Sequence, residues 1–161
     1  MNIYKNFLPK NNFNEIYNTI LIGDYFPWYY APYQVTSSKK NTSYMFHTFI
    51  ENGNINSSFI NLVSPILKKL KPKNVINVRA NLYLKRPSYC SWHVDGFTKN
   101  LNHKTAIYYL NTNNGYTEFK NKKIKSLKNK IIIFDANLKH RAKAQTDKDI
   151  RVVINFNYEL N

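Results

Sequence analysis

From residue 74 onward, short segments rich in Val, Ile, Tyr and Phe recur with turn signals between them. Many short strands at close spacing are typical of an all-β sandwich or barrel. The segments predicted as strands are residues 74–84, 88–94, 104–110, 116–119, 122–127, 130–135, 138–145 and 150–159. This part of the chain is therefore expected to form a β core.

Helical periodicity marks the beginning of the chain. Residues 11–22 place apolar side chains on one helical stripe. Asn12 and Glu15 have the spacing of a capping box, and Gly23 is expected to end this helix.

A second amphipathic helix is predicted over residues 57–70, kinked or restarted at Pro65. Residues 43–51 alternate moderately and predict a strand, whereas residues 23–33 contain two prolines and predict an irregular packed segment. Helices followed by strands favour a helical layer on a β core, within a mainly β (α+β) fold. We predict a single domain over residues 1–161, in which 1–73 support a core formed by 74–159.

The composition is that of a folded protein, because 43% of the 161 residues are hydrophobic and 16% are aromatic. No apolar run approaches the ~20 residues needed to cross a bilayer, and the N-terminus lacks the pattern of a signal peptide. The single cysteine, Cys90, excludes an internal disulfide and fits a reducing compartment. We expect a cytoplasmic protein without a membrane partner.

The net charge of +15 invites a nucleic-acid interpretation. However, 20 of the 24 basic residues are lysine, whereas nucleic-acid readers favour the bidentate fork of arginine. Lys, Asn, Ile and Tyr all have AT-rich codons, so genomic drift is a competing explanation. The lysine-rich residues 120–130 predict a solvated hairpin arm that discourages edge pairing, with contact to an acidic partner as the alternative.

The stretch CSWHVDGF, residues 90–97, places His93 and Asp95 two positions apart. On a strand these side chains share a face and can converge on one ion. The alternative is that Asp95 caps a turn while His93 is a core aromatic. His140 follows the apolar strand IIIFD and offers a third ligand. Two histidines and a carboxylate form the facial triad of non-haem Fe(II) sites, although zinc hydrolases can use the same set.

Arg151 helps to decide between a non-haem Fe(II) site and a zinc hydrolase site. It begins the apolar segment RVVINFNY, and a buried arginine needs an anionic partner because an unpaired buried charge is very costly. That partner is either Asp147 or Asp149 nearby, or the far carboxylate of a dicarboxylate co-substrate held bidentately. We favour the co-substrate, because arginine is rare in this chain.

Three segments carry a specific resemblance to a known family. They are LYLKRPSYCSWHVD (82–95), TAIYYLNTNNGYTEF (105–119) and NKIIIFDANLKHRAKAQTDKDIRVVINFNY (129–158). In this order they resemble the Fe(II)/2-oxoglutarate-dependent dioxygenases, in particular the prolyl 4-hydroxylase-like branch. FPWYY (26–30) is similar to a segment of small oxygenases of marine phages, which would place the protein in the host cytoplasm.

The resemblance implies a double-stranded β-helix, the cupin-like jelly roll, with the N-terminal helices packed on its major sheet. It implies Fe(II), 2-oxoglutarate and dioxygen as cofactors and co-substrates, with ascorbate as a further candidate. The implied metal ligands and catalytic centre are His93, Asp95 and His140.

For the co-substrate, the resemblance implies that Arg151 binds the distal carboxylate of 2-oxoglutarate with Tyr109 as hydroxyl partner. Tyr109 shares a strand face with Ile107 and Thr105 and can face the barrel, while Tyr108 faces elsewhere. Tyr83 corresponds to a tyrosine near the co-substrate or substrate. Asn81 either donates to that region or is a strand asparagine satisfied by backbone.

Three features depart from the family pattern or qualify it. Tyr116 replaces the second glycine of the Gly-Gly-x-Thr-x-Phe motif, which puts a close backbone approach in question. Arg151 lies farther than usual from the distal histidine, consistent with a longer hairpin at QTDKD. Asp95, as a carboxylate, argues against the halogenating branch. Tyr89, Trp92 and Phe97 are candidates for an aromatic lining of the mouth, with ordinary core packing as the alternative for at least one of them.

The leading hypothesis is a dioxygenase that hydroxylates an unactivated C–H bond of a peptidyl proline or other protein side chain, releasing succinate and carbon dioxide. A nucleic-acid demethylase and a hydroxylase of a free amino acid or small metabolite use the same chemistry. The non-enzymatic alternative is a jelly-roll binding module. The expected partner is a peptide or protein, because the final strand lacks the further arginine usual in demethylases.

Overall fold

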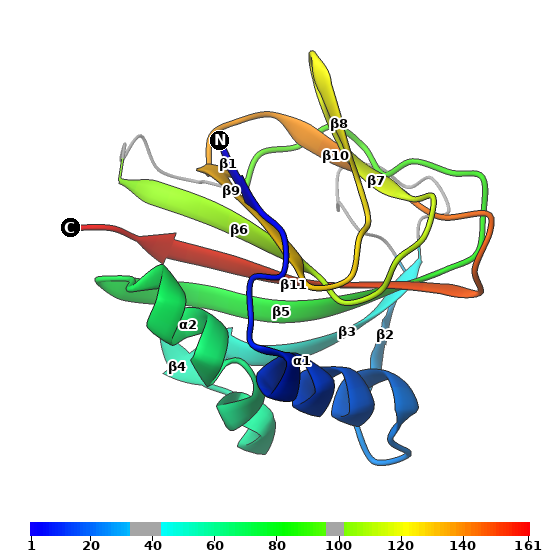
Figure 1. Cartoon of the computed structure of the whole chain (residues 1–161). Helices are drawn as coiled ribbons and strands as arrows, with labels where there is room; N and C mark the ends of the chain where they lie inside the picture. The colour runs from blue at the N-terminus through cyan, green and yellow to red at the C-terminus, as the bar shows by residue number, and fades with distance from the viewer. Residues whose placement is uncertain (33–42, 96–101) are drawn as a thin grey trace.

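The structure, a computed structural model, describes residues 1–32, 43–95 and 102–161. Its larger sheet is antiparallel and dominates Figure 1. The strand order is β1 (Asn2–Tyr4), β9 (Lys130–Asp135), β6 (His103–Tyr109), β11 (Ile150–Glu159), β5 (Asn74–Leu84), β3 (Tyr44–Glu51) and β2 (Tyr29–Ala31), while β4 (Asn54–Ile55) pairs with β3. Strands that are distant in sequence therefore become neighbours, as in a jelly roll.

A smaller antiparallel sheet has the order β10 (His140–Lys143), β7 (Tyr116–Phe119) and β8 (Lys122–Lys125). Its β7–β8 hairpin projects at the top of Figure 1. One apolar cluster draws side chains from both sheets, among them Ile107, Val153, Phe119 and Ile124, and therefore lies between them. The two facing sheets confirm the predicted jelly roll.

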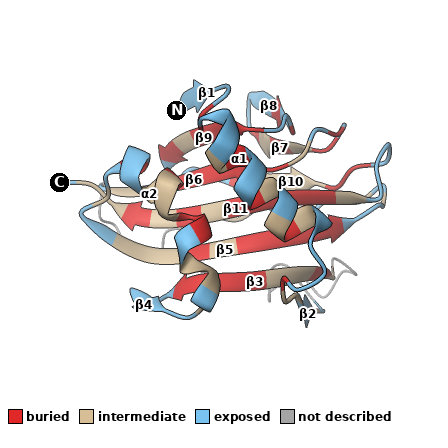
Figure 2. Ribbon diagram, turned by 60° about the horizontal axis from the view of Figure 1, so that its bottom comes forward, coloured by how far each residue is buried: buried red, intermediate tan, exposed pale blue. Residues whose placement is uncertain are grey.

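The helices cover the opposite face of the larger sheet. They are α1 (Lys10–Tyr17), which continues into the π-helical turn η1 (Asn18–Ile22), and α2 (Ser64–Leu70), which follows the 3-10 turn η2 (Ser58–Leu62). Ile16 and Ile66 pack with Phe156 in the main core cluster, and Figure 2 shows the buried faces of the helices against the sheet. The predicted helical layer is confirmed. Among the described residues, no helix is long and apolar enough to span a bilayer.

Alternation along β11 supplies both the core and the site. Val152, Ile154, Phe156 and Tyr158 pack in the main core beneath the helices. Arg151, Val153 and Asn155 point the other way, into a pocket between the sheets. Strand geometry requires this arrangement because successive side chains lie on opposite faces. The same rule separates Tyr108, in the main core, from Tyr109, between the sheets, as predicted.

The predicted capping box is wrong. Helix α1 begins at Lys10, with Pro9 at its N-cap and no side-chain cap hydrogen bond. Asn12 consequently lies inside the first turn instead of preceding it, where its side chain cannot cap the helix. Gly23 does end the helical segment, in an extended conformation. The predicted restart at Pro65 is also confirmed, because that residue lies in the first turn of α2.

Two strand assignments need correction. The segment 23–33 was expected to be irregular, yet Tyr29–Ala31 form β2 by pairing with β3. Residues 88–94 were expected to form a strand, yet they make only isolated bridges, Tyr89 with Lys143 and His93 with His140. Tertiary partners decide both cases, because a strand requires a neighbour in continuous register.

Candidate metal and co-substrate site

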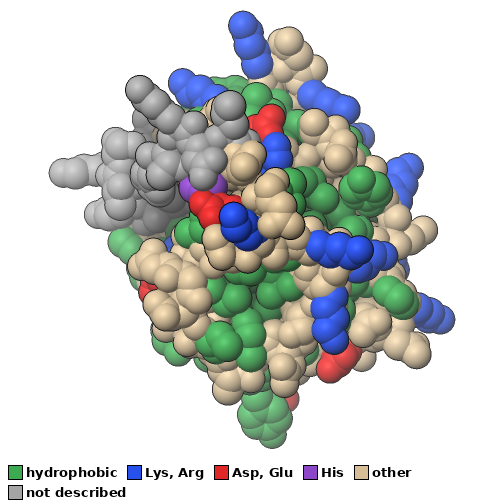
Figure 3. All heavy atoms as spheres, turned by 90° about the vertical axis from the view of Figure 1, so that its left-hand side faces the viewer, with side chains coloured by type: hydrophobic (Ala, Val, Ile, Leu, Met, Phe, Trp, Pro, Cys, Tyr) green, Lys and Arg blue, Asp and Glu red, His purple; other side chains and the backbone are tan. Residues whose placement is uncertain are grey.

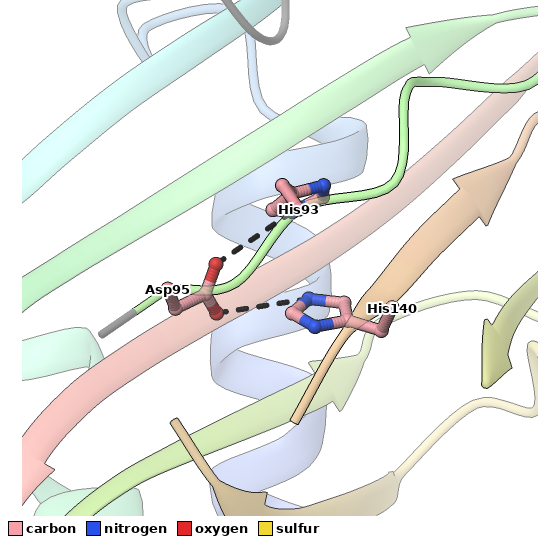
Figure 4. A group of neighbouring side chains, drawn as sticks. All are labelled: His93, Asp95 and His140. Carbon is pink, nitrogen blue, oxygen red and sulfur yellow. Dashed lines mark ion pairs between the residues drawn. The ribbon is translucent and has the colours of Figure 1, made fainter. Parts of the chain in front are cut away.

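His93, Asp95 and His140 point toward one another in the space between the sheets (Figure 4). His93 Nε2 lies 3.6 Å from one oxygen of Asp95, and His140 Nε2 lies 3.7 Å from the other. One ligand atom from each residue lies within 4.8 Å of the others. These separations exceed hydrogen-bond length but suit three donors that surround one ion at ~2 Å each.

The bridge between His93 and His140 brings the ligands together. Each residue donates its backbone N–H to the carbonyl of the other, both at 2.9 Å. From the Tyr89–Lys143 bridge to this one, the chain advances four residues on one side and three on the other. The pairing therefore slips by one residue. The two ligands His93 and Asp95 come from this irregular segment and not from the strand that the sequence predicted.

Both imidazoles are oriented in the same way. His93 Nδ1 donates to the Ser91 carbonyl at 2.9 Å, and His140 Nδ1 donates to the Leu138 carbonyl at 3.0 Å. A carbonyl can only accept, so the proton of each neutral ring lies on Nδ1. In this neutral form, the lone pairs of both Nε2 atoms face Asp95. Such backbone anchors commonly fix the tautomer of metal-binding histidines.

The Asp95 carboxylate is held by two residues of the larger sheet. Thr105 Oγ1 donates to Asp95 Oδ2 at 3.1 Å, and Asn157 Nδ2 lies 3.4 Å from the same oxygen. Asn157 also donates to Thr105 at 3.1 Å, so the two side chains brace each other. Sequence reasoning missed these positioning roles. The available signal was alternation, which puts Asn157 on the same face of β11 as Arg151.

Burial and the Asp95 carboxylate shift the pKa values of the two histidines in opposite directions. Burial lowers the pKa of His140, although Asp95 opposes the shift. Burial also lowers the pKa of His93, but contacts with Cys90, Ser91 and Asp95 outweigh it and raise that pKa to about 9. A divalent ion needs neutral imidazoles, so its binding would release the His93 proton.

A narrow pocket, with a cavity volume of about 20 Å³, lies between the two histidines of the triad and Arg151. Its lining combines the two histidines, apolar side chains and a few polar groups. The lining residues are Tyr83, His93, Ile107, Thr117, His140, Ala142, Arg151, Val153 and Asn155. Polar and apolar side chains thus contribute about equally to this concave site, and the convergent polar groups are the kind that orient a small ligand.

Arg151 is 1% exposed, and part of its guanidinium has no protein partner. Nε donates to Ser126 Oγ at 2.8 Å, and Nη2 lies 3.4 Å from Thr117 Oγ1, but Nη1 has no hydrogen bond in the described part of the chain. Within that part, no ion pair joins Arg151 to Asp147 or Asp149, which were the structural alternatives. A buried guanidinium with an unused donor provides a place for an anion.

Tyr109 and Tyr83 lie beside this guanidinium. Its Cζ is 5.7 Å from the ring centre of Tyr109 and 5.3 Å from that of Tyr83. The Tyr109 hydroxyl donates to Thr117 Oγ1 at 2.8 Å. Burial raises the pKa of Tyr109 to about 12, against the opposing charge of Arg151, so the phenol remains a donor at neutral pH.

Asn81 lies on β5, two residues before Tyr83, and is 6% exposed. Its Oδ1 has no hydrogen-bond partner in the described residues, and the same holds for Oδ1 of Asn155. The backbone therefore does not satisfy the side-chain oxygen of Asn81, as one of the two interpretations had required. Each of these unused amide oxygens is available to accept a hydrogen bond from a ligand.

Gly115, and not Tyr116, provides the close approach in the turn before β7. A Cβ at Gly115 would lie 2.8 Å from Arg151 Cδ and 3.0 Å from the Lys143 carbonyl oxygen. Real Cβ contacts are essentially never as short as the first distance. The Tyr116 hydroxyl instead lies 2.7 Å from the Tyr89 hydroxyl. The departure from the Gly-Gly pattern thus leaves the approach to Arg151 intact.

The expected aromatic mouth is only partly represented. Tyr89 and Trp92 flank Arg141, whose Cζ is 4.1 Å and 4.7 Å from their ring centres. Arg141 alternates on β10 with the pocket residues His140 and Ala142, so this stack faces away from the pocket. These two aromatics therefore do not line it. Phe97 lies outside the described residues.

Among the comparisons with known proteins, only the one with solved structures found proteins similar to this chain. No protein-family model matches the sequence, and no curated protein matches it. A prolyl hydroxylase from Trichoplax adhaerens, in complex with a peptide fragment of the hypoxia inducible factor oxygen degradation domain, has a TM-score of 0.66 at 15% identity, covering 98% of this chain and 83% of its own. A collagen prolyl hydroxylase of Paramecium Bursaria Chlorella virus-1 has a TM-score of 0.63 at 15% identity, covering 99% and 90%.

A third similar structure is the non-heme α-ketoglutarate-dependent epimerase SnoN of nogalamycin biosynthesis. Its TM-score is 0.68 at 10% identity, over 98% of this chain and 75% of that one. The chain therefore has the fold of the 2-oxoglutarate/Fe(II) oxygenases, with prolyl hydroxylases among its structural neighbours. Since that fold supports hydroxylation and epimerisation alike, the chemistry of this chain must be argued from its own site.

The residues present fit the metal and the co-substrate of that fold. Two histidines and one carboxylate match the non-haem Fe(II) donor set and leave coordination positions for other ligands. The unused donor of Arg151 at the end of the same pocket matches the far carboxylate of a dicarboxylate. His93, Asp95 and His140 could thus hold the ion while Arg151 holds the opposite end of the co-substrate.

Proposed function

We propose that this protein is an Fe(II)- and 2-oxoglutarate-dependent dioxygenase that hydroxylates an unactivated C–H bond. The proposal rests above all on one combination: a three-residue donor set, and a buried arginine with an unused donor in the pocket that the two histidines of this set line. A zinc hydrolase would explain the three donors but would give Arg151 no partner. A dicarboxylate co-substrate explains both features.

The roles of the residues follow from their positions. His93, Asp95 and His140 would hold the iron, which when bound supplies the activation of dioxygen. Thr105 and Asn157 would keep the Asp95 carboxylate aimed at the ion, and the backbone anchors would direct both Nε2 atoms toward it once the imidazoles are neutral.

At the other end of the pocket, Arg151 would bind the distal carboxylate of 2-oxoglutarate. Tyr109 would donate its hydroxyl to the same group, since its high pKa keeps it protonated. Ile107 and Val153 supply apolar walls between the two ends. This lining limits the access of water to the reacting centre. Tyr83 and Asn81 would complete the polar surroundings of the co-substrate.

For the primary substrate we propose a peptidyl proline or another protein side chain. Support comes from the prolyl hydroxylases among the structural neighbours, one of which binds a peptide fragment. A nucleic-acid substrate has less support. On the face shown in Figure 3, Lys and Arg side chains are scattered among polar, apolar and acidic groups and form no single basic patch. A continuous positive surface is the usual footprint of nucleic-acid binding.

The first test is turnover without a substrate. Protein supplied with Fe(II) and 2-oxoglutarate should release succinate slowly, and Asp95→Ala should abolish this release because the donor set is broken. Asp135→Ala is the matched control, since its carboxylate is exposed and pairs with Lys104. A folded wild-type protein that releases no succinate would instead support the binding module.

The second test identifies the substrate. Proline-containing peptide libraries incubated with the enzyme should yield products heavier by one oxygen, as detected by mass spectrometry. Single-stranded DNA carrying methylated bases should show neither turnover nor salt-dependent binding. Demethylation of the DNA in the absence of peptide modification would reverse this order of candidates.

A further inference from the structure

Lys130 is a second buried cation near Arg151, and the sequence alone predicted no role for it at the site. It is the first residue of β9 and only 6% exposed, although it was also predicted as the last residue of a solvated arm. Alternation puts it on the same face as Ile132 and Phe134, which pack between the sheets. Its ammonium group therefore points into the interior of the barrel.

Adjacent residues of one segment hold the two cations. Lys130 Nζ donates to the carbonyl of Lys125, and Arg151 Nε donates to the hydroxyl of Ser126 at 2.8 Å. The ring of Tyr109 lies near both, with its centre 4.9 Å from Lys130 Nζ and 5.7 Å from Arg151 Cζ. The cations thus share the end of the barrel that lies beyond the pocket.

Neither cation has an acidic partner in the described part of the chain. Within the described residues, no ion pair involves Lys130 or Arg151. The titratable and charged groups facing Lys130 are Arg151 from β11, Tyr109 from β6 and Lys5 beyond β1. Burial, and then Lys5 and Arg151, lower the pKa of Lys130 to about 8. Two uncompensated buried cations are unfavourable unless an anion joins them.

We propose that Lys130 is a positioning residue of the co-substrate pocket, whose positive charge strengthens binding of the distal carboxylate by Arg151 and makes that binding pH-dependent. This inference rests on the proposed function. Lys130 does not line the pocket, so its charge would act through space and not by direct contact. An incoming carboxylate would favour the ammonium form and raise the pKa of Lys130, so binding would take up protons.

The charge state of Lys130 determines whether the affinity for 2-oxoglutarate rises or falls with pH. The carboxylates of 2-oxoglutarate stay ionised above neutral pH, and arginine stays charged. Lys130 carries its full charge below pH 7 and loses it as pH rises through about 8 and above. Affinity for 2-oxoglutarate should therefore fall between pH 7 and pH 9.5, by roughly tenfold for a charge separated from the carboxylate by a low-dielectric interior.

The experiment measures the Kd of 2-oxoglutarate for Mn(II)-loaded protein from pH 7 to pH 9.5, with pyruvate as a 2-oxo acid that lacks the distal carboxylate. Lys130→Met should weaken 2-oxoglutarate binding about tenfold at pH 7 and remove the pH dependence. Lys130→Arg should retain the affinity while also removing the pH dependence. Lys128→Met is the matched control, because it removes an exposed positive charge from the same segment.

The outcomes separate the two proposals. If wild-type protein binds 2-oxoglutarate equally well at every pH, and Lys130→Met matches it within twofold, the role of Lys130 is refuted while the proposed function stands. An equal loss of pyruvate affinity would also refute it, because that loss indicates structural damage. If wild-type protein binds no 2-oxoglutarate, both proposals fall. If Lys130→Met does not fold, Lys130→Arg is the test. Retained affinity with no pH dependence supports the role of Lys130, and the pH dependence of the wild-type protein in this variant refutes it.

Discussion

Gly115→Ala should weaken co-substrate binding without affecting the metal. The added Cβ would lie 2.8 Å from Arg151 Cδ, 2.9 Å from Asn113 Oδ1 and 3.0 Å from the Lys143 carbonyl oxygen. The Lys143 carbonyl is backbone and paired within the sheet, so the arginine side chain must give way. A shift of about 1 Å would restore an ordinary contact, because carbon atoms prefer separations of ~3.5–4.0 Å.

Such a shift displaces the guanidinium from Ser126, to which Nε donates at 2.8 Å. A hydrogen bond from a charged group contributes about 1.5–3 kcal/mol, and misalignment would forfeit part of that value at the bound carboxylate. We therefore expect a loss of about 1.5 kcal/mol, or roughly tenfold in the Kd of 2-oxoglutarate. Titration of Mn(II)-loaded protein measures this loss.

Metal affinity is the internal control, because none of the three donors contacts Gly115. Ser126→Ala is the matched comparison, since it removes the hydrogen-bond partner of Arg151 without adding a steric clash. An unchanged Kd for 2-oxoglutarate in Gly115→Ala would refute the reasoning, because it would show that the position of Arg151 does not control binding. Equal losses of metal and co-substrate affinity would indicate general unfolding instead.

Three further results are expected. Thr105→Val should weaken metal binding about tenfold in a metal titration, because Asp95 loses its hydroxyl donor, and unchanged affinity would contradict this positioning role. Asn12→Ala should change the free energy of unfolding by less than about 0.5 kcal/mol in denaturant titrations, because this side chain forms no cap, whereas a loss above 1 kcal/mol would revive the capping box. The folded protein lowers the pKa of Lys130 to about 8, so the unfolded chain binds more protons above that pH. Lys130 should therefore make the free energy of unfolding rise with pH from about 8 to 10. Lys130→Met should flatten that rise. Identical pH profiles of the two proteins would show that the pKa of Lys130 is not lowered.

Local pattern was sufficient for most of the fold. The boundaries predicted for residues 74–84, 116–119 and 130–135 coincide with β5, β7 and β9. Runs of β-branched and aromatic residues bounded by turns specify strands well when continuous neighbours are available. The restart of the helix at Pro65 was equally local, because proline lacks the N–H that an interior helical turn requires.

Pairing partners decided what local pattern could not. Residues 88–94 have the composition of a strand, yet the slip of one residue opposite β10 leaves only two bridges. Tyr29–Ala31 lie between prolines, yet they become a strand because β3 offers an edge. Lys130 belongs to a lysine-rich run, yet its position in β9 turns it inward.

For the site, the order of residue types along the chain determined the candidates His93, Asp95, His140 and Arg151. The scarcity of acidic residues and arginines made these positions conspicuous. Only the tertiary structure decided that the three donors converge and that Arg151 lacks an acidic partner in the described chain. The contacts of Thr105 and Asn157 with Asp95, and the burial of Lys130, could also be recognised only from the tertiary structure. The physical reason is that distances between strands far apart in sequence depend on sheet order and register, which no local pattern encodes.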